Sequence, residues 1–178
     1  MKTSTKYGNA LLKEGCFRIR KDQLMKNTNY NIFVENGKIG IYVPATSQKI
    51  PAVYDTIKVE TVEMQGYFVL RLIVSQNGKY GVITIDNKVL IPVTYDRLNY
   101  LPIRIENNVV EYFYASKDCK RGLLDYKGQP VLPLQYDGLK RIKSKKAGWI
   151  SFQVKKGDKE SKIAIKPDTT DWVACWVA

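Results

Sequence analysis

Short stretches in which apolar and polar residues alternate run through most of the chain, and turn-forming residues separate them. Residues 39–43 and 80–85 are two such stretches, and an Asn-Gly dipeptide precedes each of them, at 36–37 and 77–78. Alternation with a period of two predicts β-strands, and Asn-Gly is the dipeptide that type I′ hairpin turns prefer. No convincing helical pattern occurs in this part of the chain. The sequence therefore predicts β-hairpins.

The hairpin pattern recurs at an interval of 41 residues, in three copies without insertion or deletion. Self-similarity at a fixed period of this size is typical of repeat architectures. A glycine inside each predicted strand indicates a bulge or a close approach of another backbone segment. The repeated residues, which we expect to be structural, are Gly40, Gly81, Gly122, Pro51, Pro92, Pro133, Tyr54, Tyr95, Tyr136, Asp55, Asp96 and Asp137.

We expect three to four short strands in each copy. A second turn leads into a short apolar strand that we expect to end at the repeated proline. Proline cannot donate a hydrogen bond to a ladder, so it either ends this strand or places it at a sheet edge. We expect the outer strand of the next unit at residues 66–74 and 109–115. The repeated aspartates are expected to accept hydrogen bonds from turns.

The residues Asn-Gly-Lys-aromatic-Gly, followed by a hairpin and Ile-Pro-x-x-Tyr-Asp, carry a resemblance to a known family. The pattern resembles the bacterial WG-repeat (KWG) family over residues 31–165 and most strongly over residues 77–96. Ile39, Tyr80 and Arg121 replace the tryptophan that names the family. Arg121 cannot keep the aromatic packing, so we expect it to face solvent or a partner. The resemblance implies a β-rich repeat scaffold that serves as an interaction surface, and it transfers no active site.

We predict a single all-β domain over residues 1–178 that forms an open, twisted array. Three regular units, at 31–71, 72–112 and 113–153, lie between an N-terminal cap at 1–30 and a C-terminal region at 154–178. That region combines a degenerate unit with a cap. The alternative is a small closed propeller or barrel, in which the two ends of the chain together complete a fourth blade.

Lysine and arginine are concentrated at the two ends of the chain. The net charge is +12 over 178 residues, and it divides into +5 for residues 1–30, zero for 31–116 and +7 for 117–178. A repeat array has distinct ends, so this distribution predicts one or two basic patches on an otherwise neutral surface.

Ten basic residues are therefore candidates for contact with nucleic acid or another anion. Lysines with interleaved aromatic residues suit a groove that follows a phosphate backbone and stacks bases. A solvated loop and an atypical capping strand are the alternative explanations for the same residues. The candidates are Arg18, Arg20, Lys21, Lys140, Arg141, Lys143, Lys145, Lys146, Lys155 and Lys156.

Three tryptophans and one arginine are candidates for a protein interface. They are Trp149, Trp172, Trp176 and Arg121. Tryptophan and arginine often contribute much of the binding energy at interfaces. The alternative for Trp172 and Trp176 is that they cover the end of the hydrophobic core.

The sequence argues against an enzyme. It contains no histidine, the commonest general base, and no glycine-rich phosphate loop in a strand-to-helix context. Its three cysteines, Cys16, Cys119 and Cys175, are odd in number and far apart, so we expect neither a disulfide framework nor a zinc site. No cofactor and no metal are expected. No apolar run reaches the length of a membrane span and no signal-peptide core follows the start, so we expect a cytoplasmic location.

Two functional hypotheses follow. The first is a non-catalytic adaptor that binds another protein, as an accessory subunit of a bacterial nucleic-acid-associated complex such as a defence complex. The second is direct, non-sequence-specific binding of DNA or RNA through the basic ends. Self-association through sheet edges stays open, because an open array leaves unpaired backbone at its ends. Binding of a small ligand in a cleft between units has no supporting residues in the sequence.

Overall fold

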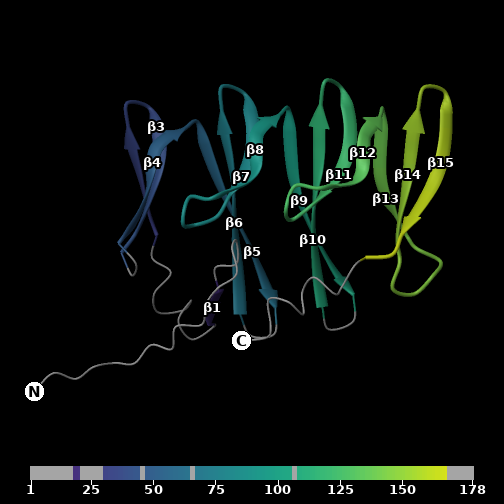
Figure 1. Cartoon of the computed structure of the whole chain (residues 1–178), viewed down its shortest axis with the longest axis horizontal. Helices are drawn as coiled ribbons and strands as arrows, with labels where there is room; N and C mark the ends of the chain where they lie inside the picture. The colour runs from purple at the N-terminus through teal and green to yellow at the C-terminus, as the bar shows by residue number, and fades with distance from the viewer. Residues whose placement is uncertain (1–17, 21–29, 45–46, 65–66, 106–107, 168–178) are drawn as a thin grey trace, which may run out of the picture.

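The computed structural model describes residues 18–20, 30–44, 47–64, 67–105 and 108–167. These residues form four antiparallel sheets that follow one another along the long axis of the molecule (Figure 1). The prediction of an all-β, open array is confirmed, and the described residues do not close into a propeller or barrel. No helix is found among them, and hence none long and apolar enough to cross a membrane.

Consecutive strands build each sheet. The first sheet contains β2 (Asn31–Glu35), β3 (Lys38–Val43) and β4 (Gln48–Tyr54). The second contains β5 (Thr56–Met64), β6 (Tyr67–Gln76), β7 (Lys79–Ile83) and β8 (Val89–Tyr95), and the short β1 (Arg18–Arg20) pairs with the start of β6. The third contains β9 (Arg97–Ile105), β10 (Asn108–Lys117), β11 (Lys120–Asp125) and β12 (Pro130–Tyr136). The fourth contains β13 (Gly138–Ile142), β14 (Ile150–Lys156) and β15 (Lys159–Ile165).

The sheets change at the repeated Tyr-Asp pairs, so each predicted unit spans parts of two neighbouring sheets. The period of 41 residues gives the length of a unit but not its starting point. The strands expected to be outermost, at 66–74 and 109–115, correspond to β6 and β10. That expectation is wrong, because β5 and β9 pair along the outer side of β6 and β10 and make them internal strands.

The repeated proline does not end its strand. Strands β4, β8 and β12 continue through Pro51, Pro92 and Pro133, so the expectation that they end there is wrong. All three strands lie at a sheet edge, which was the other expectation. On an edge strand the missing N–H can face away from the neighbouring strand, so proline costs no ladder hydrogen bond.

The repeated glycine lies where the edge strand bulges. The pairing of β7 with β8 shifts register between Tyr80 and Val82, on either side of Gly81. A Cβ atom on Gly81 would lie 2.7 Å from the carbonyl oxygen of Ile91. A real Cβ would clash at that distance, so the predicted close approach of another backbone segment is confirmed. Gly40 and Gly122 occupy the same place in the first and third sheets.

Each repeated aspartate joins its own hairpin to the next one. The Asp55 carboxylate accepts hydrogen bonds from the ammonium group of Lys38 and, at 2.6 Å, from the backbone N–H of Asn77. Asp96 and Asp137 repeat this arrangement; the lysines are Lys79 and Lys120, and the backbone donors are Asp118 and Gly157. The prediction that the aspartates accept turn hydrogen bonds is confirmed. These contacts hold neighbouring sheets in register.

Three hydrophobic clusters fill the spaces between the four sheets. Strand β10 contributes to two of them: Tyr112 packs toward the fourth sheet, whereas Phe113 packs toward the second. Successive side chains of a strand point to opposite faces, so an internal sheet is buried on both sides. Among the described residues, the first sheet shares a core only with the second, and the fourth only with the third.

Candidate nucleic-acid interface

The fourth sheet forms the C-terminal end of the described array, and its two faces differ. Ile150 and Phe152 of β14 are buried against the third sheet. Because side chains alternate along a strand, Ser151 lies on the opposite face. Strand pairing places Ile142 of β13 and Ala164 of β15 beside Ser151. This second face is the outer surface of the array in Figure 1.

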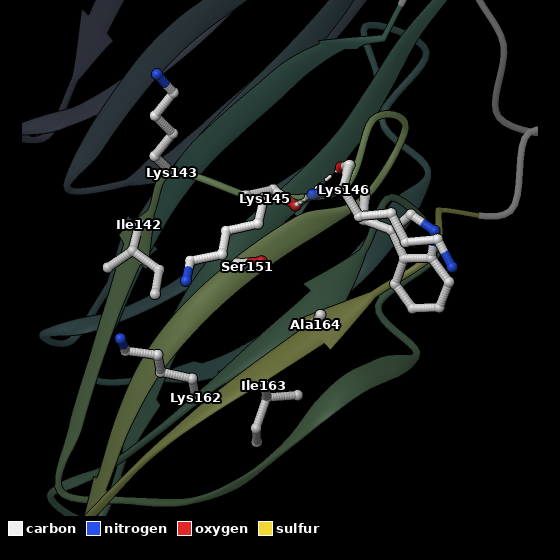
Figure 2. A pocket seen from close by; sticks show the side chains of 10 residues that line it. Ile142, Lys143, Lys145, Lys146, Ser151, Lys162, Ile163 and Ala164 are labelled. Atoms are coloured by element: carbon white, nitrogen blue, oxygen red, sulfur yellow. Dashed lines mark hydrogen bonds between the residues drawn. The ribbon is translucent and has the colours of Figure 1, made fainter.

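A hollow of about 370 Å³ lies on this outer face, next to the loop of residues 143–149 that connects β13 to β14. Figure 2 shows Lys145 lying across the sheet above Ser151, with its ammonium group directed toward the side where Lys162 lies. We call it the lysine hollow. Its lining residues are Ile142, Lys143, Ser144, Lys145, Lys146, Trp149, Ser151, Lys162, Ile163 and Ala164.

A tight turn sets the position of the aromatic residue. The N–H of Trp149 donates to the carbonyl oxygen of Lys146 at 3.3 Å, and Gly148 has a φ of 73°. Turns with a positive φ at the third position strongly favour glycine. The Ser144 hydroxyl donates to the Lys146 carbonyl at 3.0 Å and helps to fix the loop. As a result, the Lys146 ammonium lies over the Trp149 indole, 4.3 Å from the ring centroid.

Trp149 also borders a second hollow, of about 400 Å³, on another side of the same loop. Lys143 and Ser144 line both hollows, and Arg141 lines only the second. Both hollows are therefore built around one loop and one indole ring.

The lysine hollow is strongly positive. Four lysines line it, and none of the ion pairs in the described part of the chain involves any of them. The nearest acid on the same face of β15 is Glu160, which accepts a hydrogen bond from the Gln153 amide at 2.9 Å. The positive charge at this hollow is thus not neutralised by neighbouring carboxylates.

The structure brings together only some of the predicted contact residues. Lys143, Lys145, Lys146 and Trp149 lie together at the lysine hollow. Lys140 is exposed on the same outer face, whereas Arg141 pairs with Phe152 and so belongs to the opposite face. Their separation follows from the alternation along β13, since neighbouring residues of a strand cannot share a face.

The remaining predicted residues lie elsewhere. The Lys156 ammonium donates to the Gln135 side chain at 2.9 Å, which ties it to the third sheet, and Lys155 is exposed near the β14–β15 turn. Arg18 and Arg20 belong to β1, which is attached to the second sheet, and Arg121 belongs to the third. Lys21, Trp172 and Trp176 are outside the described residues.

Lys162 is a residue of the lysine hollow that the sequence prediction missed. It lies opposite Gln153 in the β14–β15 pair, on the outer face. The alternation within residues 159–165 could have predicted its exposure, because it places Lys162 and Ile163 on opposite faces of the strand. Its pairing with β14 is visible only in the folded chain.

No protein-family model matches the chain, and no curated protein or solved structure matches it either. The resemblance to WG repeats therefore stays a prediction. In the described residues, no group of three or more histidine, cysteine or acidic side chains is placed to hold a metal ion.

Proposed function

We propose that this chain is a non-catalytic binding module whose fourth sheet binds the phosphate backbone of single-stranded nucleic acid. The observation that carries the proposal is the lysine hollow, in which four lysines and one tryptophan line a single depression without a paired acid. Neutralisation of phosphates by lysine releases condensed counterions, and this release supplies most of the affinity of non-specific nucleic-acid binding.

Trp149 gives the same site a stacking surface. Lys146 covers the indole in the free protein, and an exposed cation–π contact is worth about 0.5–1 kcal/mol. Stacking of a base on an aromatic ring is worth about 1–3 kcal/mol. A base therefore displaces the ammonium group from the ring, and the released Lys146 pairs with a neighbouring phosphate.

Binding at this hollow has little sequence preference. Apart from the lysines, its lining consists of two serines, small or apolar side chains and Trp149. It lacks the asparagine, glutamine, arginine and acidic side chains that commonly recognise base edges. Contacts are made to phosphates and to the faces of bases, as in single-strand binders without sequence preference.

The test is fluorescence anisotropy with a labelled thymidine oligonucleotide at several salt concentrations. We expect the logarithm of affinity to fall linearly with the logarithm of salt, with a slope of about −0.7 for each phosphate contacted. Replacing Lys145, Lys146 and Lys162 by glutamine should reduce the magnitude of the slope by about 2 and the affinity by tenfold or more at low salt.

The matched control replaces three exposed lysines on the second and third sheets, Lys58, Lys88 and Lys117, by glutamine. It removes the same net charge and should change the slope much less. Equal losses in the two triple variants would mean that net charge, and not the lysine hollow, determines binding, and would refute the proposal.

A second candidate function, protein binding, rests on the open edge of the first sheet. Strand β2 pairs only with β3 among the described strands, and Ile32 and Val34 are 56% and 66% exposed. Their counterparts 41 residues later, Ile73 and Ser75, are 5% and 4% exposed, because Ile73 packs in the core between the second and third sheets and β5 covers the edge of β6. An added strand from a protein partner would cover β2 in the same way. Together the two functions would make the chain an adaptor in a nucleoprotein complex.

The lysine substitution Val34→Lys tests this second function. It places a charge on an open strand edge, a common protection against strand addition. We expect less than about 0.5 kcal/mol change in the free energy of unfolding, because the site is exposed. Sedimentation should show whether wild-type chains self-associate. Co-purification from native cells should show whether another protein binds. Strand addition at β2 is excluded if every complex survives Val34→Lys unchanged.

A further inference from the structure

Three polar residues form a row across the third sheet. Arg97 of β9 lies opposite Ser116 of β10, and Ser116 lies opposite Arg121 of β11. Directly opposed residues on antiparallel strands project from the same face. This face is the one that packs toward the fourth sheet, because Arg121 also lies opposite Tyr136, a member of the core between these two sheets.

The row lies in a cleft of about 690 Å³ between the third sheet and the start of β13. We call it the arginine cleft. Small-molecule sites usually have volumes of about 300–1,000 Å³ and combine apolar walls with a few polar groups. The residues that line it are Asp96, Arg97, Asn99, Tyr114, Ala115, Ser116, Cys119, Arg121 and Leu139.

The second sheet shows what the regular repeat places at this position. The residues 41 positions earlier are Thr56, Ser75 and Tyr80. The Thr56 and Ser75 hydroxyls are 2.6 Å apart, Ser75 is 4% exposed, and Tyr80 packs against the core. The third sheet keeps the serine but has arginine on both sides of it.

The two arginines carry uncompensated positive charge. The acid in the cleft, Asp96, is already paired with Lys79 and the backbone N–H of Asp118. No hydrogen bond or ion pair to either arginine side chain is found within the residues that the structure describes. The row therefore has a local charge of about +2 in the absence of a ligand.

The spacing allows both guanidinium groups to reach one anion. Neighbouring strands lie about 4.8 Å apart, so two strands place the Cα atoms of Arg97 and Arg121 about 10 Å apart, with Ser116 midway between them. Arginine side chains are long enough to converge across this distance, and the planar guanidinium binds two oxygens of a phosphate or carboxylate at once. The Ser116 hydroxyl adds a third donor.

We propose that the arginine cleft binds a phosphate monoester, held by Arg97, Ser116 and Arg121. A phosphate monoester carries a charge near −2 above its second pKa of about 6, which matches the two guanidinium groups, whereas a carboxylate neutralises only one. The site is independent of the proposed nucleic-acid function, because it lies near the β10–β11 turn of the third sheet and not on the outer face of the fourth.

Cys119 provides a local reporter, because this exposed free thiol lies at the cleft. The rate of its alkylation in the full chain is measured by mass spectrometry of the Cys119 peptide, at constant ionic strength, with inorganic phosphate, adenosine monophosphate or acetate. We expect the two phosphates, but not acetate, to slow alkylation. If adenosine monophosphate protects Cys119 at a lower concentration than inorganic phosphate does, the apolar residues of the cleft also contact the adenosine. If the two protect equally, the cleft recognises the phosphate group alone.

Calorimetric titration with adenosine monophosphate measures the affinity directly. The variant Arg97→Thr with Arg121→Tyr rebuilds the row of the second sheet, so it should fold and should raise the dissociation constant tenfold or more. Arg104→Gln, an exposed arginine at the other end of β9, should change it less than twofold. Affinity should also weaken as pH falls through about 6, where the phosphate takes up a proton.

Three results would overturn the proposal. The first is alkylation of Cys119 that neither phosphate nor adenosine monophosphate slows. The second is equal protection by acetate, which would show that the site does not recognise a dianion. The third is unchanged affinity in the folded Arg97→Thr, Arg121→Tyr variant, with folding checked by far-ultraviolet circular dichroism.

Discussion

The three repeated aspartates show how one side chain can serve two neighbouring sheets. The carboxylate of Asp96 binds the Lys79 ammonium within its own sheet and accepts the N–H of Asp118 at 2.8 Å from the next hairpin. The lysine hydrogen bond, followed by the backbone hydrogen bond, lowers the pKa of Asp96 below its usual value. Asp55 and Asp137 have lowered pKa values for the same reasons.

These lowered pKa values predict a loss of stability in acid. A carboxyl group whose pKa is lower in the folded than in the unfolded chain contributes its full stabilisation above the unfolded value of about 4. That contribution is lost as pH falls through the lower, folded value. We expect Asp96→Asn to reduce the urea midpoint at pH 7 and to make its decline below pH 4 shallower than in the wild type.

The control is Asp158→Asn, which removes a carboxylate from the fourth hairpin, where it is exposed. Urea midpoints measured between pH 7 and pH 2 should show the difference. A decline as steep in Asp96→Asn as in the wild type would mean that the aspartate contacts do not set the acid limit of stability.

At the scale of elements, a buried ion pair links β6 to β10. The Arg71 guanidinium lies 2.7 Å from the Glu111 carboxylate, and their side chains are 1% and 0% exposed. The Tyr100 hydroxyl of β9 donates to the same carboxylate at 2.7 Å. Burial first, and then the negative charge of Glu111, raise the pKa of Tyr100 far above its usual value, so it stays a donor.

This ion pair joins the second sheet to the third, so its removal tests what it contributes to stability. Glu111→Leu leaves the Arg71 charge buried without its carboxylate, and we expect a loss of about 3–5 kcal/mol in the free energy of unfolding. The double variant Arg71→Met, Glu111→Leu should regain much of this loss, because an apolar pair of similar volume packs without buried charge. Urea denaturation measures both, and a double variant no more stable than Glu111→Leu would contradict this account.

At the scale of the whole molecule, the array is held by contacts between neighbours. Each of the three cores joins two successive sheets, so stability is close to a sum over nearest-neighbour interfaces, as in other repeat proteins. Damage to one interface should therefore stay local.

Phe152 tests this expectation, because it is fully buried in the core between the third and fourth sheets. Phe152→Ala should cost about 3–5 kcal/mol at that interface. Hydrogen exchange followed by mass spectrometry should show faster exchange in β9–β15 and nearly unchanged protection in β2–β4. A uniform loss of protection along the chain would mean that the four sheets unfold as one cooperative unit.

The two ends of the array expose different surfaces. The first sheet leaves the apolar edge of β2 exposed, with Ile32 and Val34 on it, whereas the fourth carries the lysine hollow. The sequence already placed the positive charge at the ends and the neutral units between them. The two surfaces lie on the first and last of the four successive sheets, so they are far apart in the array.

The sequence alone determined the repeated β-architecture and the roles of its marker residues. The roles of Gly81 and Asp96 were predictable because each depends on local structure. Another backbone segment lies too close to Gly81 for a Cβ atom, and the Asp96 carboxylate accepts a hydrogen bond from a turn. The lysines of the 143–149 loop were predictable for the same reason, since a short loop keeps neighbours in sequence close in space.

The tertiary structure alone decided which strands pair and which side chains from different strands converge. A period of 41 residues is the same wherever the unit starts, so the sequence did not show that sheets change at the Tyr-Asp pairs or that β6 and β10 are internal. The register of β15 against β14 places Lys162 at the lysine hollow. The register of β9, β10 and β11 places Arg97 and Arg121 on either side of Ser116. Register depends on backbone pairing between distant segments, and a shift of one residue would move each of these side chains to the other face.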